Sequence, residues 1–243
     1  MSRPPGRGAP KWMVGGLVLG LAVIVAGIAL SKKENPGPLD PRLGIADSAA
    51  TRQLGLRQQV DHPVNESQQK AANSLDSEKA PFFSLKGTDG RTHTLAELNR
   101  EKPLLIFFVE KECPCCLGAK YFVDKMADAY GEGLNTIGII NADGETAQTW
   151  VRATKPKFLV LQDPKQIVIR KYKAERGVYT TLIAPGGTID KAYPGYGKEM
   201  LQDLGKRIAR LAKLPEKRFT HAAAPDTMTS GCIFPDPNES TTP

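Results

Sequence analysis

The sequence predicts an α/β domain with a mixed central sheet and helices on both faces. From residue 80 onward, apolar runs of strand length alternate with segments of helical periodicity. The most apolar of these runs, Leu104–Val109, is uninterrupted, as expected of a strand that is covered on both faces. Two later runs flank Pro185-Gly186-Gly187, which indicates an antiparallel hairpin and therefore a mixed sheet.

The composition favours one folded domain with extensions. At 243 residues and 40% hydrophobic content the chain can build a genuine core. The formal charge is +7, but Lys and Arg are interleaved with acids along the chain, so nucleic-acid binding is not expected. Three of the 4 cysteines are neighbours in the sequence, which does not resemble a structural disulfide framework. The cysteines are therefore expected to do chemistry.

An uncharged apolar run, Met13–Leu30, follows a short N-terminal segment of residues 1–12. At ~1.5 Å per residue it is long enough to cross a bilayer core, so we expect one uncleaved transmembrane helix. A cleaved signal peptide is the alternative, because Gly27-Ile28-Ala29 has the spacing of small residues at a cleavage site. The flanking charges weakly favour a cytoplasmic N-terminus, which would place the rest of the chain outside the cytoplasm, at the cell membrane.

Two polar segments bracket the predicted domain of residues 80–214. Residues 31–79 are rich in Pro, Gln, Asn and Ser, which predicts a flexible tether. Residues 215–243 are rich in Pro and Thr and are expected to be a C-terminal tail.

Each element of the domain has its own pattern. In chain order, strands are expected at 80–85, 92–95, 104–109, 135–140, 158–161, 178–183 and 188–192. Asp89-Gly90 has the chemistry of the turn between the first two strands. Helices are expected at 95–99, 117–130, 145–152 and near 201–211, where apolar residues recur at helical spacing.

The chemistry centres on Cys113-Pro114-Cys115-Cys116, between the strand ending at Val109 and the next helix. Unpaired N–H groups and the positive end of the dipole at a helix start favour a thiolate. A disulfide between residues this close in sequence adds little stability, so Cys113 and Cys116 are expected to be a redox pair. Structural zinc is the rival interpretation, but the other cysteine, Cys232, does not supply a second ligand pair.

The order of these elements, together with Ala80-Pro81-Phe82-Phe83-Ser84-Leu85 and Cys113-Pro114-Cys115-Cys116, resembles the thioredoxin fold. More narrowly, it resembles membrane-anchored redoxins of the AhpC/TSA and TlpA-like families. The resemblance implies that Cys113 attacks a substrate disulfide and that Cys116 resolves the mixed disulfide. It implies protein thiols and disulfides as partners, with a membrane electron donor as one candidate, and neither a cofactor nor a metal.

The chain departs from this family in two places. Gly177-Val178-Tyr179 stands where the family has a proline after Gly-Val, so Val178 or Tyr179 is expected to line the dithiol, with strand-edge packing as the alternative for Tyr179. Phe107 stands where thioredoxin has a buried acid. Glu110, Lys111 and Glu112 are interpreted as solvated loop charges.

Three other functions were weighed against disulfide exchange. The peroxidatic motif that a peroxiredoxin resembles is Pro-x-x-x-Thr/Ser-x-x-Cys. Counting back from Cys113, its Thr/Ser and Pro positions hold Glu110 and Ile106, and counting back from Cys116 they hold Cys113 and Val109, so neither register fits. A thioredoxin-like copper-binding protein or a redox-inert assembly factor is a further alternative, since three thiols suit Cu(I). His93 and His221 are expected to be surface residues.

Two cysteines are assigned auxiliary roles. Cys115 could compete with Cys116 as the resolving thiol. Cys232 is expected to be a free or locally packed thiol in the tail, and the alternative is that Ile233 and Phe234 dock on the domain and bring it to Cys115 or to a partner. Cys113 is expected to be the exposed member of the redox pair because it precedes the helix, whereas Cys116 lies in the first helical turn.

Overall fold

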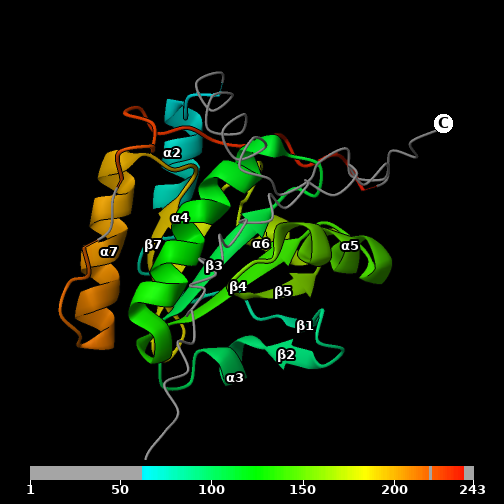
Figure 1. Ribbon diagram of the computed structural model, residues 1–243, viewed down its shortest axis with the longest axis horizontal. Helices are drawn as coiled ribbons and strands as arrows, with labels where there is room; N and C mark the ends of the chain where they lie inside the picture. Colours follow the sequence, from blue (N-terminus) through cyan, green and yellow to red (C-terminus); the bar gives the residue numbers. More distant parts are fainter. Residues whose placement is uncertain (1–61, 219–220, 238–243) are drawn as a thin grey trace, which may run out of the picture. The chain divides into compact units, whose positions relative to one another are not determined.

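The computed structural model describes residues 62–218 and 221–237, and Figure 1 shows their arrangement. The predicted anchor, Met13–Leu30, and most of the predicted tether lie outside this range. No helix within the described residues is both long and apolar enough to span a bilayer.

The secondary structure follows the predicted order closely. The helices are α2 (Glu66–Asn73), α3 (Leu95–Leu98), α4 (Pro114–Tyr130), α5 (Gly144–Thr154), α6 (Ile167–Lys171) and α7 (Lys198–Ala212). The strands are β1 (Ser84–Lys86), β2 (Thr92–Thr94), β3 (Leu104–Val109), β4 (Asn135–Ile140), β5 (Leu159–Gln162), β6 (Thr180–Ala184) and β7 (Thr188–Tyr193).

The main sheet has the strand order β5-β4-β3-β6-β7, with β3 in the middle. Strands β4 and β5 continue in parallel from β3, whereas β6 and β7 are antiparallel to their neighbours. The predicted mixed sheet is therefore confirmed. A separate two-stranded hairpin, β1-β2, turns at Gly90, whose φ of +83° suits glycine.

Helices cover both faces of the sheet (Figure 1), because β3 alternates its side chains between two cores. Leu105, Phe107 and Val109 pack with α4, α5 and α7. Leu104, Ile106 and Phe108 pack with α2 and α6. All of β3 is buried, which explains why its sequence is an unbroken apolar run.

The predicted tether is wrong at its C-terminal end, because residues 62–79 pack on the domain. Helix α2 is capped by Asn65, whose side chain accepts a hydrogen bond from the Gln68 N–H. Ala72 and Leu75 are buried in the second core, and the Ser77 N–H donates to the Ile189 carbonyl at 2.8 Å. Local composition did not reveal this packing because its partners come from β7, more than a hundred residues away.

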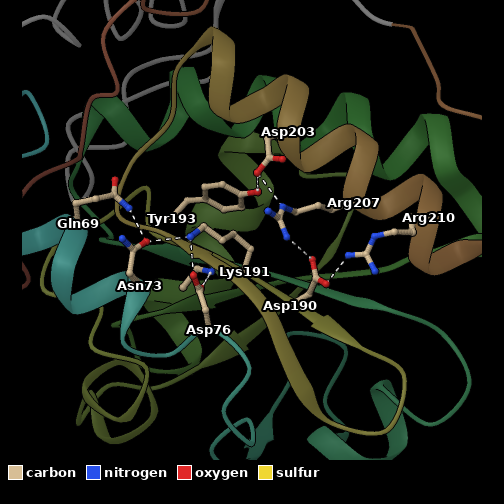
Figure 2. Close-up of polar contacts among 10 residues, drawn as sticks. Gln69, Asn73, Asp76, Asp190, Lys191, Tyr193, Asp203, Arg207 and Arg210 are labelled. Atoms are coloured by element: carbon tan, nitrogen blue, oxygen red, sulfur yellow. Dashed lines mark hydrogen bonds and ion pairs between the residues drawn. The ribbon is translucent and has the colours of Figure 1, made fainter.

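Charged side chains join α2 and α7 to the two sides of β7 (Figure 2). Arg207 and Arg210 of α7 both reach Asp190, at 3.2 and 2.5 Å. On the α2 side, Lys191 lies 2.5 Å from Asp76 and donates to Asn73 at 2.9 Å. Asp76 also accepts from the Ala192 N–H at 3.1 Å, so it connects the end of α2 to both a side chain and the backbone of β7.

Replacing Asp76 with Ala should therefore lower the free energy of unfolding by about 2 kcal/mol, because it removes a charged pair and a backbone hydrogen bond together. Asn73→Ala is the matched control. It removes only exposed side-chain hydrogen bonds, from Lys191 and from Gln69, and a loss of about 0.5 kcal/mol is expected. Urea unfolding of both variants measures the difference, and equal losses would show that residues 62–79 do not contribute to the fold in this way.

Candidate redox site

The predicted cysteine motif opens helix α4. Cys113 is the residue that precedes the first helical turn, Pro114 is the first helical residue, and Cys116 completes the turn. Proline suits this position because its missing N–H would have no helical partner there. The Cys116 N–H donates to the Cys113 carbonyl at 3.1 Å, which holds both thiols on the same end of the helix.

All four cysteines are reduced in the structure and gather around the sulfur of Cys113. The Cys115, Cys116 and Cys232 thiols and the Cys232 backbone N–H donate hydrogen bonds to it, and these bonds hold the pKa of Cys113 far below its ordinary value despite burial. The Cys113 thiolate in turn raises the pKa of Cys115, and burial together with this thiolate raises that of Cys116. Cys113 is therefore the thiolate of the group and its neighbours are thiols.

The expectation that Cys113 is exposed is wrong, because its exposed fraction is only 2%. The predicted C-terminal tail covers it. Residues 229–234 run over the start of α4, and the Cys232 N–H donates to Cys113 Sγ at 3.1 Å. Cys232 itself is half-buried and packed against the cluster, where its thiol forms hydrogen bonds with Cys113 and Cys115. Phe234 is buried in the domain, so the arrangement matches the alternative of a docked tail that brings Cys232 to Cys115.

Gly177 provides the room for this arrangement. A Cβ atom at this position would lie 2.8 Å from Cys116 Sγ and 3.2 Å from the Glu110 Cβ, closer than a real side chain tolerates. The glycine before β6 therefore permits the sulfur of Cys116 to pack directly against the backbone of the loop.

Val178 and Tyr179 go to opposite sides of the sheet. Val178 packs in the core that holds the cysteines, and its φ of +70° is a strained conformation for a β-branched residue. Tyr179 packs in the other core, edge-on to Phe108 with ring centroids 5.8 Å apart. Of the two residues expected to line the dithiol, the structure brings Val178 to the site. Tyr179 instead packs against Phe108 of β3, which was the alternative expected for it.

Glu110 is a site residue that the sequence interpretation missed. It is buried, with an exposed fraction of 5%, whereas its neighbour Glu112 is exposed. Its carboxylate accepts from the Glu112 N–H at 3.0 Å and from the Asn141 amide at 3.4 Å. Burial raises the pKa of Glu110 to about 7, and the Cys113 thiolate adds to this effect. The interpretation of Glu110 as a solvated loop charge is therefore wrong.

The carboxyl of Glu110 also affects the pKa of the Cys116 thiol. Its charge contributes to the raised pKa of Cys116, and the Glu110 backbone N–H donates to the Cys116 sulfur. Position 107 within β3 is Phe, and the buried acid of this site, Glu110, comes directly after the end of that strand. The sequence carries one signal for a role of Glu110 in the site, which is its position directly between a buried strand and the cysteine motif.

Tyr196 is the second lining residue that was missed. It is buried beside Phe122, with ring centroids 5.9 Å apart. Burial raises the pKa of its phenol, with a further contribution from the nearby cysteines, and the Tyr196 hydroxyl has no hydrogen-bond partner within the described residues. No sequence pattern marked this residue.

The two histidines weighed as metal ligands lie elsewhere. His93 is buried in the β1-β2 hairpin, 3.0 Å from Asp89, so its expected surface position is wrong. Residues 62–218 and 221–237 contain no group of three or more His, Cys, Asp or Glu side chains arranged to hold a metal ion.

Comparison with known proteins agrees with this geometry. The model of the AhpC/TSA family matches residues 77–192. Two Mycobacterium tuberculosis proteins, each named "Putative peroxiredoxin", are 29% identical over 106 residues, which is 43% of this chain and 68% of each relative. These matches confirm the prediction of an oxidoreductase.

Solved structures confirm the fold. A structure titled "Putative Thioredoxin", from Neisseria meningitidis, aligns with a TM-score of 0.50 and 25% identity, over 58% of this chain and 94% of that one. A "putative Thiol:disulfide interchange protein DsbE" from Chlorobium tepidum aligns with a TM-score of 0.52 and 20% identity, over 56% of this chain and 97% of that one. The predicted thioredoxin-like architecture is therefore correct.

Proposed function

We propose, from the premise that this chain carries a thioredoxin-like redoxin domain, that it exchanges disulfides with partner proteins through Cys113 and Cys116. The observation that carries the proposal is the cluster at the start of α4, where one buried sulfur accepts hydrogen bonds from three thiols and a backbone amide. Such a thiolate is a good leaving group and a selective nucleophile in exchange.

The reaction takes place in two displacements. The Cys113 thiolate attacks one sulfur of a partner disulfide, forming a mixed disulfide and releasing the partner's other sulfur as a thiolate, which takes up a proton. Cys116 then attacks Cys113 Sγ, so that the Cys113–Cys116 disulfide forms and the partner's second thiolate leaves. The partner disulfide is reduced by two electrons and the cysteine pair is oxidised by two.

Glu110 is placed to take the proton of Cys116 in the second displacement. Burial raises the pKa of Cys116, so this thiol needs a base before it can attack. A carboxyl whose pKa is raised to about 7 accepts a proton at neutral pH more readily than an ordinary glutamate would. In the opposite direction, the same carboxyl returns the proton when Cys116 leaves.

Reduction of insulin disulfides by dithiothreitol tests the proposal. The full chain, in detergent, should accelerate the reaction well above the uncatalysed rate. Hydrogen peroxide should be assayed in parallel, because two relatives carry the name peroxiredoxin. Rapid peroxide consumption without disulfide reduction would replace this proposal with a peroxidase, and the absence of both activities would contradict a redox function.

Location is a second part of the proposal. The apolar run Met13–Leu30 supports a single membrane anchor, and a redox domain outside the cytoplasm would receive electrons from a membrane donor. A reporter fused after Pro243 should be accessible from outside the cytoplasmic membrane. A cytosolic reporter would contradict the orientation, and a mature N-terminus near Leu30 would contradict the anchor.

A further inference from the structure

The C-terminal segment, residues 229–234, lies as an extended strand on the loop that precedes β6. The Gly177 N–H donates to the Cys232 carbonyl and the Gly231 N–H donates to the Gly177 carbonyl, both at 2.9 Å. The Phe234 N–H donates to the Glu175 carbonyl at 3.1 Å, and Arg176 pairs with Ile233 in an antiparallel bridge. In Figure 1 the segment is part of the red loop that passes the start of α4.

The segment is held along its whole length. Thr229 and Tyr196 exchange two backbone hydrogen bonds of 2.9 Å, and the Ser230 N–H donates to the His62 carbonyl at 2.8 Å. Phe234 is buried in the second core. At Gly231 a Cβ would lie 2.7 Å from the Gly177 carbonyl oxygen, so only glycine permits this close approach. The contact between the two glycines brings Cys232 to the dithiol.

The segment also contacts the sulfur of Cys113 directly. The Cys232 N–H donates to Cys113 Sγ, and the Cys232 thiol also forms hydrogen bonds with Cys113 and Cys115. The backbone groups of Gly177 and Glu175 that the segment occupies are those that an extended polypeptide would use to add a strand beside the site. The segment therefore stands where a partner strand carrying a cysteine would have to lie.

We propose that residues 229–234 are an internal partner strand, and that Cys232 exchanges with the Cys113–Cys116 disulfide in the oxidised protein. The inference rests on the proposed function of this cysteine pair. The Cys232 thiolate attacks Cys113 Sγ, the Cys113–Cys232 bond forms, the Cys113–Cys116 bond breaks, and Cys116 leaves as a thiolate that takes up a proton. One disulfide replaces another, so no external oxidant is needed.

The negative charge of Cys113 controls whether Cys232 can ionise and attack. In the reduced protein the Cys113 thiolate is the first cause of the raised pKa of Cys232, which is about 11, so Cys232 is a thiol. Once Cys113 is part of a disulfide, its negative charge is gone and Cys232 becomes easier to ionise. A Cys113–Cys232 bond would fix the segment across the site and shut out partner proteins until it is reduced.

The test uses the full chain with Cys116→Ser, exposed to one equivalent of oxidised glutathione, followed by alkylation and peptide mapping without reduction. Cys113 should first form a mixed disulfide with glutathione. Cys232 should then attack Cys113 Sγ and release glutathione as a thiolate that takes up a proton, so that the cross-linked peptide contains Cys113 and Cys232. Glutathione that stays on Cys113 while Cys232 is alkylated would overturn this inference and leave the proposed function intact. A Cys115–Cys232 peptide would also overturn it. Failure of Cys113 to react at all would overturn both this inference and the proposed function.

A second variant tests the segment as a cover. Gly231→Ala should displace the segment from Gly177. The free energy of local opening should then fall by about the contribution of one hydrogen bond, so alkylation of Cys113 in the reduced protein should become roughly tenfold faster. Gly144→Ala is the matched control, since its Cβ would meet only the Gln162 side chain, at 3.5 Å. Equal alkylation rates in both variants would show that the segment does not guard Cys113.

Discussion

Cys113→Ser is expected to reduce disulfide exchange to the rate of the buffer thiol alone. Serine cannot form the mixed disulfide, and none of the other cysteines has the same environment. The pKa of Cys113 is lowered by its hydrogen-bond donors, whereas those of Cys115, Cys116 and Cys232 are raised by the same contacts or by burial. In the wild-type protein at neutral pH the attacking thiolate is therefore confined to Cys113, the residue that precedes the first turn of α4.

The matched control is Cys115→Ser, which changes an adjacent buried thiol and removes one donor to Cys113. We expect this variant to keep its disulfide reductase activity, with a modest loss. If Cys115→Ser removes the activity while Cys116→Ser retains it, Cys115 is the resolving thiol and the assignment of Cys116 is wrong. Insulin reduction by the three variants decides between these outcomes.

Glu110→Gln is expected to slow resolution of the mixed disulfide about 100-fold near neutral pH, since a positioned base contributes on this scale. The wild-type rate should rise with pH as Glu110 loses its proton. This rise should lie below about 7, because the mixed disulfide lacks the Cys113 thiolate charge that adds to burial in raising the pKa of Glu110 to that value. In the variant this rise should be lost, and the rate should increase only when Cys116 itself ionises at higher pH. Rapid-mixing measurements of mixed-disulfide decay give both profiles.

Glu112→Gln is the matched control because Glu112 is the exposed acid two residues away. It should leave the rate and its pH dependence nearly unchanged. A similar loss in both variants would mean that the negative charge of the loop, and not the buried carboxyl, affects the reaction.

The same carboxyl should make the stability of the reduced protein depend on pH. The pKa of Glu110 is raised from 4.5 to about 7 on folding, so the folded state binds this proton more tightly than the unfolded state. Its contribution is fully present below pH 4.5 and is lost as the pH rises through about 7. Over this pH window the free energy of unfolding of the wild type should fall by about 3 kcal/mol more than that of Glu110→Gln, as measured by urea unfolding.

The parts of the fold that could be predicted from the sequence are those whose pattern is local. Strand β3 begins and ends where its apolar run does, because burial on both faces leaves no polar position within it. Strand β4 has the predicted bounds as well, although Asn135 and Thr136 at its start are only partly buried. The cysteine motif opens α4 as expected, since proline suits the first turn of a helix.

The parts that could not be predicted depend on contacts between distant residues. Ser230 and Thr229 are buried polar residues in a Thr- and Pro-rich segment, and their backbone groups are satisfied by His62 and Tyr196. Nothing in their own sequence shows these partners. The same reason explains why Cys113 is buried and why α2 belongs to the domain. Glu110 was missed because one acid near a strand end looks the same whether its side chain points into the site or into solvent.

The most direct test of the account is to identify which sulfur first accepts a disulfide. The full chain carrying both Cys116→Ser and Cys232→Ser, which removes the resolving thiol and the internal competitor, is mixed with oxidised glutathione and its glutathione adduct is located by mass mapping. We predict a single adduct on Cys113, with Cys115 alkylated as a free thiol. An adduct on Cys115 with Cys113 unmodified would contradict the assignment of the attacking thiolate, and with it the proposed mechanism.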